Sequence, residues 1–161
     1  LDWVPGYRAG GGLLAFDSNY RPRLWPDEAT ARTAVAAAWR QTDIALPSVD
    51  DEMALFGDAT EAAVLNRLAG YGLTSGALKR GAAGPLALDG SAAGPFPPAP
   101  RVIDSTAAGD SFNGGYLGAR LTGATEAGAL AAGHALAARV VGAKGAILPR
   151  DTAPPPAEGA A

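Results

Sequence analysis

A run of small residues ends in an aspartate at positions 104–110, where the sequence is Asp-Ser-Thr-Ala-Ala-Gly-Asp. Small side chains allow a backbone to approach a ligand closely, and Gly109 can adopt dihedral angles closed to other residues. We expect a strand before this run and a helix after it, which would leave the amides of Ala107, Ala108 and Gly109 as free donors. Such donors, together with the helix dipole, bind negatively charged groups such as phosphate. No Gly-Lys-Ser/Thr sequence follows, so the run is not a Walker loop.

Asp110 would stand at the place where that anion binds. A carboxylate is a poor ligand for an anion because like charges repel. It is well suited to act as a base that accepts the proton of a hydroxyl attacking the phosphate. The alternative is that Asp110 only caps a helix, since aspartate is a favoured capping residue. These residues alone leave both interpretations open.

A polar segment, 17–25, follows an apolar run at 13–16 that predicts a buried strand. Ligands of α/β proteins collect where strands end. Arg21 carries the planar guanidinium that binds a carboxylate or a phosphate with two hydrogen bonds. We interpret it as a candidate binder of an anionic substrate. The alternative is a solvated loop in which Asp17 neutralises Arg21.

Acidic residues cluster at 48–52, with the sequence Ser-Val-Asp-Asp-Glu, after a second predicted strand. Carboxylates near a phosphate indicate magnesium bound through waters, because this ion keeps part of its hydration shell. The alternative is a helix start whose acids offset the helix dipole, and this is the commoner reason for such a composition.

Basic residues and glycines share the segment 79–84, which has the sequence Lys-Arg-Gly-Ala-Ala-Gly. Lys79 or Arg80 would meet a phosphate there, and the alternative is a plain hairpin turn. The single histidine, His134, lies in an Ala-rich helix. In such a helix a packed or half-exposed histidine is more common than a ligand.

Strands and helices must position these segments, and the sequence predicts them in alternation. Short apolar runs indicate strands, and longer segments with capping signals indicate helices. This alternation favours an α/β fold with a mostly parallel sheet. The predicted strands are 13–16, 43–46, 75–79, 85–88 and 102–103, and the predicted helices are 26–40, 50–56, 60–69, 110–121 and 124–141. Residues 1–12 carry no clear signal, 90–100 form a loop, and 149–161 form a Pro/Ala-rich disordered tail.

Composition limits the partners and the location. The 161 residues carry a net charge of −3 with no basic stripe, so we expect no nucleic-acid surface. No apolar run approaches the roughly 20 residues that a membrane helix needs, and the start lacks the features of a signal peptide. The chain has no cysteine, which excludes disulfides and fits a reducing, cytoplasmic location. The first residue is not Met, so we expect that an upstream segment is missing.

The run 104–117 resembles, throughout, the C-terminal signature of the PfkB carbohydrate kinases, which are ribokinase-like sugar kinases. The resemblance implies that Asp110 is the catalytic base and that Ala107, Ala108 and Gly109 form an anion hole for the transferring phosphoryl group. It implies ATP and Mg²⁺ as cofactors. It also makes the capping-only interpretation of Asp110 the weaker one.

The segment 17–25 has the pattern Asp-x-Asn-x-Arg-Pro-x-Leu-Trp, which is similar to the family branch that phosphorylates 2-keto-3-deoxygluconate. The resemblance implies that Arg21 holds the acidic sugar, with Asn19 and Tyr20 nearby. The expected function is ATP-dependent phosphorylation of 2-keto-3-deoxygluconate. The alternatives are a fructokinase or ribokinase acting on a neutral sugar, or a non-catalytic nucleotide-binding fragment.

The family carries Asn-x-x-Glu at the place of Ser48 and Asp51, where the motif helps to position magnesium and phosphate. Both residues depart from that pattern, although a serine in the first position resembles the ketodeoxygluconate branch. The resemblance further implies that the 79–84 segment lines the nucleotide site. We therefore expect Lys79, Arg80, Gly81, Gly84, Ser48 and His134 to contact the nucleotide, and Asp51 to act on magnesium indirectly.

Family members are about twice as long as this chain, so the resemblance covers a C-terminal half. It implies a ribokinase-like three-layer αβα sandwich whose N-terminal half and β lid are missing. We expect 1–148 to form the nucleotide-binding part of the kinase domain and 149–161 to be its tail. The full-length parent is expected to be a homo-oligomer.

Overall fold

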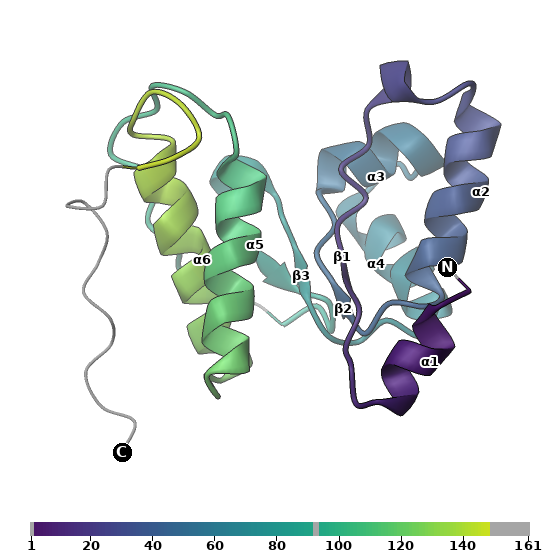
Figure 1. Cartoon of the computed structure of the whole chain (residues 1–161). Helices are drawn as coiled ribbons and strands as arrows, with labels where there is room; N and C mark the ends of the chain where they lie inside the picture. Colours follow the sequence, from purple (N-terminus) through teal and green to yellow (C-terminus); the bar gives the residue numbers. More distant parts are fainter. Residues whose placement is uncertain (1, 92–93, 149–161) are drawn as a thin grey trace.

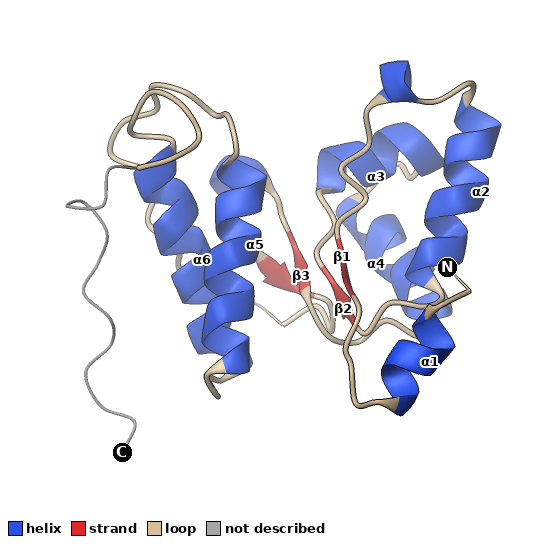
Figure 2. Ribbon diagram, viewed as in Figure 1, coloured by secondary structure: helices blue, strands red, loops and turns tan. Residues whose placement is uncertain are grey.

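The structure is a computed structural model, and it describes residues 2–91 and 94–148 of the chain (Figures 1 and 2). The predicted tail at 149–161 lies outside these residues. The strands are β1 (Ala15–Phe16), β2 (Ile44–Ala45), β3 (Ala77–Leu78) and β4 (Leu86–Ala87). The helices are α1 (Val4–Ala9), α2 (Glu28–Trp39), α3 (Val49–Phe56), α4 (Glu61–Gly70), α5 (Ala108–Leu121) and α6 (Glu126–Val140), with 3-10 turns at Pro22–Leu24 and Gly81–Ala83.

The sheet is mostly parallel, as the sequence predicts. β1 pairs with β2 in parallel, and β3 pairs with β4 antiparallel. Parallel bridges from Ala45 to Gly76 and from Ser48 to Lys79 continue the sheet from β2 to β3. Gly76 has a φ of 129°, and a Cβ there would lie 1.8 Å from the carbonyl oxygen of Ala45. Only glycine therefore allows this close approach.

Helices cover both faces of the sheet, which gives the expected three layers. Successive strand residues point to opposite faces. Ile44 and Ala77 accordingly pack against α5 and α6, whereas Ala45 and Leu78 pack against α2, α3 and α4. Figure 1 shows α5 and α6 on one side of the strands and α2, α3 and α4 on the other. The carboxyl ends of β1, β2 and β3 thus lie between two helical layers.

Two segments differ from the sequence-based expectation. Residues 4–9, which carry no clear signal, form α1, and Arg8 ties this helix to Asp43 through an ion pair of 2.6 Å. Residues 102–103 are predicted as a strand, but the structure has no strand there. Both side chains are exposed, and the N–H of Ile103 donates to the carbonyl of Val141 at 2.7 Å, so no neighbouring strand receives it.

Glycines let α5 and α6 approach each other closely. A Cβ at Gly115 would lie 2.8 Å from the carbonyl oxygen of Ala132, and one at Gly133 would lie 2.9 Å from that of Phe112. Phe112 and Tyr116 are buried at this contact and stack with ring centroids 6.0 Å apart. This packing fixes the start of α5 above the end of the sheet. Among the described residues, no helix is both long and apolar enough to cross a membrane.

Candidate functional site

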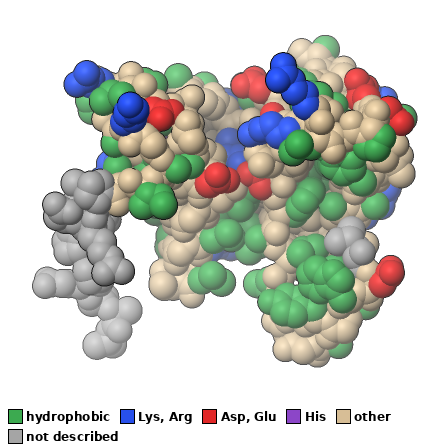
Figure 3. Space-filling model, turned by 45° about the horizontal axis from the view of Figure 1, so that its top comes forward, with side chains coloured by type: hydrophobic (Ala, Val, Ile, Leu, Met, Phe, Trp, Pro, Cys, Tyr) green, Lys and Arg blue, Asp and Glu red, His purple; other side chains and the backbone are tan. Residues whose placement is uncertain are grey.

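A cleft of about 710 Å³ lies between the ends of the parallel strands and the α5–α6 layer. Figure 3 shows this hollow, with acidic and basic side chains gathered beside it. The predicted site residues that line it are Asn19, Arg21, Ser48, Asp51, Lys79, Arg80, Gly81, Ala107, Ala108, Gly109, Asp110 and His134. The structure thus brings into one cavity residues that five separate segments of the sequence supply.

The turn before α5 opens its backbone toward the cleft. Ala107 is the N-cap in a left-handed conformation, with φ 58° and ψ 18°, and no side chain caps the helix. The N–H of Ala108 donates to the carbonyl of Ser105 at 3.2 Å, so this amide is engaged, contrary to expectation. Within the described residues, the amides of Ala107 and Gly109 have no such acceptor. These two amides remain available for an anion.

Asp104 fixes the shape of this turn. Its carboxylate accepts from the N–H of Thr106 at 2.9 Å and from the N–H of Gly145 at 3.0 Å. Hydrogen bonding to the side chain and the N–H of Thr106, and then to the N–H of Gly145, lowers the pKa of Asp104. The start of α5 is thereby joined to the loop that follows α6.

Asp110 lies in the first turn of α5 and is exposed at the cleft. It does not occupy the N-cap position, which belongs to Ala107, so Asp110 is not the N-cap of this helix. Its carboxylate accepts no hydrogen bond from the described residues. A carboxylate left unpaired beside open amides is a good geometry for a base that acts on a bound hydroxyl.

Arg21 and Asp51 form an ion pair at the opposite wall, with Nη1 and Oδ2 3.5 Å apart. Arg21 also donates to the carbonyl of Tyr20 at 2.8 Å. Burial raises the pKa of Asp51, the charge of Arg21 counteracts this shift, and the nearby charge of Asp17 adds to it. The expectation that Asp17 would be the partner of Arg21, in the solvated-loop alternative, is wrong.

Tyr20, which was expected near the sugar, does not line the cleft. Its side chain is 7% exposed and belongs to the hydrophobic cluster beneath α2 and α3, because the alternation along this loop turns it inward. Asn19 instead lines the cleft with a φ of 38°, and its N–H donates to Asp17 at 3.1 Å. This short turn directs Asn19 and Arg21 to the cavity.

The segment after β3, residues 79–84, brings two basic side chains to the cleft. The ammonium of Lys79 contacts the carboxylate of Asp17 and lies 3.5 Å from the place where a Cβ on Gly109 would sit. Arg80 lines the cleft but is held by Glu61 at 3.1 Å and by the carbonyl of Gly84 at 2.9 Å. Gly84 does not line the cleft, contrary to expectation, because it packs against Phe96 instead.

His134 closes the apolar end of the cleft, where Val102, Ala137 and Val141 also lie. Its Nε2 is 2.6 Å from the carbonyl oxygen of Pro97, and its ring lies 5.1 Å from that of Phe96. An apolar wall with one polar group suits an aromatic base.

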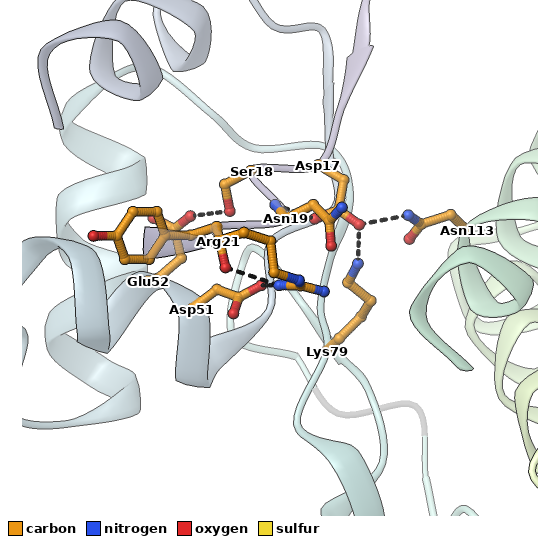
Figure 4. A network of polar contacts seen from close by, with 9 residues as sticks. Asp17, Ser18, Asn19, Arg21, Asp51, Glu52, Lys79 and Asn113 are labelled. Carbon is orange, nitrogen blue, oxygen red and sulfur yellow. Dashed lines mark hydrogen bonds and ion pairs between the residues drawn. The ribbon is translucent and has the colours of Figure 1, made fainter. Parts of the chain in front are cut away.

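Two residues beside the site, Asp17 and Glu52, make contacts that the sequence did not indicate. Asp17 accepts from both Lys79 and the Nδ2 of Asn113, the latter at 2.7 Å (Figure 4). Glu52 is fully buried, and it accepts from the hydroxyl of Ser18 at 2.6 Å and from Arg67 at 2.9 Å. Burial raises the pKa of Glu52. These contacts could not be predicted from the sequence, because the partners of Asp17 and Glu52 are distant in it.

Magnesium fits this cleft only through its waters and bound phosphates. Among the described residues, no group of three or more acidic, histidine or cysteine side chains could hold a metal ion. One or two carboxylates with phosphate oxygens are the usual protein contribution to a Mg²⁺ site. Asp51, already paired with Arg21, meets that modest requirement.

An α/β sandwich with open amides at a helix start, facing a cleft at the ends of parallel strands, defines a phosphate- or nucleotide-binding class of protein. Residues 7–153 match the pfkB family carbohydrate kinases. The chain therefore belongs to the pfkB family of carbohydrate kinases.

Individual relatives agree with this assignment. The chain is 41% identical over 152 residues to the 2-dehydro-3-deoxygluconokinases of Dickeya dadantii (strain 3937) and of Escherichia coli (strain K12), covering 91% of this chain and 49% of each relative. It is similar to the crystal structure of aminoimidazole riboside kinase from Salmonella enterica complexed with aminoimidazole riboside and an ATP analog. That match has a TM-score of 0.76 and 30% identity, and covers 90% of this chain and 51% of the other. The ribokinase-like fold is confirmed, and the chain spans about half the length of the curated relatives it matches.

Proposed function

We propose that residues 1–148 are the nucleotide-binding half of an ATP-dependent kinase of 2-keto-3-deoxygluconate, also called 2-dehydro-3-deoxygluconate. Two matched relatives carry the name of that kinase at 41% identity. The observation that carries the proposal is the cleft itself, where Asp110 and the open amides lie on one wall and Arg21 on another. A kinase needs a base, an anion hole and a substrate anchor, and these residues are the candidates for each.

Asp110 is the proposed catalytic base. The sugar hydroxyl would lose its proton to this carboxylate as its oxygen attacks the γ-phosphorus of ATP. The bond between that phosphorus and the bridging oxygen breaks in line, and ADP leaves. Asp110 is unpaired among the described residues, which leaves its oxygens free to accept the proton.

The amides of Ala107 and Gly109 are the proposed anion hole, and the engaged amide of Ala108 contributes through backbone shape instead. Donors fixed before the reaction cost no reorganisation when charge develops on the phosphoryl oxygens. Lys79 adds a full positive charge beside Gly109. This group of donors and charge supports transfer of a phosphoryl group rather than simple binding of a neutral ligand.

Arg21 is the proposed anchor for the carboxylate of the sugar acid, with Asn19 beside it. Its exposed guanidinium faces the cleft and is held loosely by Asp51, so it can accept a second partner. We place the adenine against the wall of His134, and the phosphates near Ser48, Arg80 and Gly81. Mg²⁺, when bound with ATP, neutralises phosphate charge, and Asp51 would hold one of its waters.

A neutral-sugar kinase is the second candidate, because relatives named fructokinase also match at 32% and 27% identity. The neutral sugar that such a kinase phosphorylates has no carboxylate for Arg21 to bind. A non-catalytic nucleotide-binding fragment is the third, because the chain spans about half of its relatives.

The deciding experiment is a coupled assay of ADP release with ATP, Mg²⁺ and 2-keto-3-deoxygluconate, compared with fructose and ribose. It is run on this chain and on a chain completed to the length of the relatives. We expect the completed protein to turn over the sugar acid in preference to the neutral sugars. Preference for a neutral sugar would refute the substrate assignment. ATP binding without turnover on any sugar would favour the non-catalytic fragment.

A further inference from the structure

The carboxylate of Asp17 lies at the point where three segments of the site meet (Figure 4). One oxygen, Oδ2, receives both the ammonium of Lys79 and the Nδ2 of Asn113. Asp17 follows β1, Lys79 follows β3, and Asn113 lies on α5. These partners are 62 and 96 residues away in the sequence, so the contact is purely tertiary.

Lys79 is fixed at both ends. Its N–H donates to the carbonyl of Pro47 at 2.8 Å, and its own carbonyl accepts from the N–H of Val49 at 2.9 Å. Its side chain is 12% exposed, and that of Asp17 is 18% exposed. A lysine ammonium on a flexible four-carbon stem normally samples many positions. Here the backbone bonds and Asp17 restrict it to one.

That position is beside the proposed anion hole. The ammonium lies 3.5 Å from the ideal Cβ position on Gly109, in the first turn of α5. Asn113 is three residues after Asp110 and therefore on the same side of that helix. The Asp17 carboxylate accepts the amide hydrogen, which fixes the orientation of the Asn113 side chain. One carboxylate thus ties the cation of the site to the helix that carries the base.

We propose that Asp17 is a positioning residue that holds the Lys79 ammonium against the 104–110 turn, so that its charge meets the transferring phosphoryl group. The role in transfer rests on the proposed function, whereas the placement of Lys79 by Asp17 does not. Asp17 also lines the cleft, and the role proposed here is exerted through Lys79. Without it, a free lysine would still attract phosphate but would spend little time at the reacting oxygens.

The chain offers a direct spectroscopic test, because Lys79 and Lys144 are its only lysines. In a ¹H–¹⁵N spectrum of the side-chain ammonium groups, a hydrogen-bonded ammonium exchanges slowly with water and stays visible. We expect a persistent Lys79 signal in the whole chain and a weak or absent signal from exposed Lys144. Asp17→Asn keeps the size of the side chain. It should remove the Lys79 signal, while the backbone amide spectrum remains that of a folded protein.

Asp17→Glu is the second variant and retains the negative charge. It provides the test if the Asp17→Asn protein does not fold. We expect a retained but shifted Lys79 signal in that protein. A Lys79 signal that is unchanged in the folded variant, or that is absent from the unmodified chain, would overturn the proposal. Tripolyphosphate added to the unmodified chain should shift the Lys79 signal and leave Lys144 unaffected. A Lys79 signal that depends on Asp17 but ignores tripolyphosphate would refute the phosphate site and leave the positioning role standing.

Kinetics of the completed kinase separate positioning from support of the fold. We expect Asp17→Asn to lower kcat about tenfold to a hundredfold with an unchanged or lower KM for ATP, since one negative charge near the phosphates is lost. In a Lys79→Met background the same change should lower kcat less than about twofold, because residues that act through one another are not additive. An equal loss in both backgrounds would show that Asp17 does not act through Lys79.

Discussion

Arg21 donates to Asp51 at one wall of the cleft, with Nη1 and Oδ2 3.5 Å apart, although the two residues are 30 positions apart in the sequence. The family resemblance implies that Arg21 holds the sugar acid and that Asp51 acts on magnesium. Because the two residues pair, a substrate carboxylate bound to Arg21 would lie close to the Asp51 carboxylate and compete with it for the guanidinium. In the proposed function, the sugar site at Arg21 and the metal site at Asp51 would therefore be neighbours.

Replacement of Arg21 tests the sugar anchor. In the kinase completed to family length, we expect Arg21→Met to raise KM for 2-keto-3-deoxygluconate by at least about tenfold, because a charge-assisted hydrogen bond contributes roughly 1.5–3 kcal/mol. KM for ATP should stay within about twofold. Steady-state kinetics with each substrate varied in turn provide the measurement.

Arg23→Met is the matched control for this anchor. Arg23 lies two residues further on and is exposed, but it does not line the cleft. We expect it to leave both KM values unchanged. Equal effects from the two arginines would assign the result to general charge rather than to a carboxylate site.

Glu52 tests the buried network beneath the sugar loop. It is fully buried and pairs with Arg67, whose side chain is 17% exposed. Glu52→Ala should lower the free energy of unfolding by about 3 kcal/mol, because removing one partner leaves a buried charge partly uncompensated. Denaturant unfolding of this chain measures it. Glu28→Ala, which breaks an exposed pair with Arg32, should change stability by less than about 1 kcal/mol. Similar losses from both changes would contradict the buried-network account.

Glycines in α5 should differ in their tolerance of a methyl group. A Cβ at Gly115 would lie 2.8 Å from the backbone of α6, so Gly115→Ala should destabilise the chain by about 1–3 kcal/mol through overpacking. Gly118 has open space around its Cβ position and should gain up to about 1 kcal/mol as alanine. Thermal unfolding of the two variants reports the difference in sign. Destabilisation by Gly118→Ala would point to a helix contact that this structure lacks.

Asp104 should make the stability of the folded chain depend on pH in the acidic range. Folding lowers its pKa below the ordinary 3.8, so the ionised carboxylate stabilises the folded chain fully above that pH. The contribution is lost as the pH falls through the lowered pKa. We expect the stability difference between the unmodified chain and Asp104→Asn to be largest near neutral pH and to shrink below pH 3.8, as measured by urea unfolding across the range. A constant difference would mean that the charge of Asp104 contributes nothing.

The sequence predicted the parts of the site that are contiguous along the chain. The 104–110 turn needs only small residues before a helix, and those are visible in the sequence as a single run. The layered α/β fold was also predicted, because the alternation of short strands and helices can be recognised from short stretches of sequence. Asp110 could be separated from a capping residue only after Ala107 was found at the N-cap.

Contacts made across the fold could not be predicted in this way. Nothing near Asp17 in the sequence indicates that its partner is Lys79, since the pair forms only when the ends of β1 and β3 lie together. The inward turn of Tyr20 likewise depends on the core beneath it. The strand expected at 102–103 failed because an apolar pair forms a strand only where a neighbouring strand accepts its hydrogen bonds.

The most direct test of the central claim is the Asp110→Asn variant of the completed kinase, with turnover and ATP affinity measured on the same preparation. The amide is the same size as the carboxylate but cannot accept the proton. We predict that turnover of 2-keto-3-deoxygluconate falls by at least about a hundredfold, in line with the usual contribution of a general base, while the Kd for ATP changes by less than about threefold. An Asp110→Asn enzyme that keeps its turnover would remove Asp110 from the role of the base and contradict the mechanism proposed for this cleft.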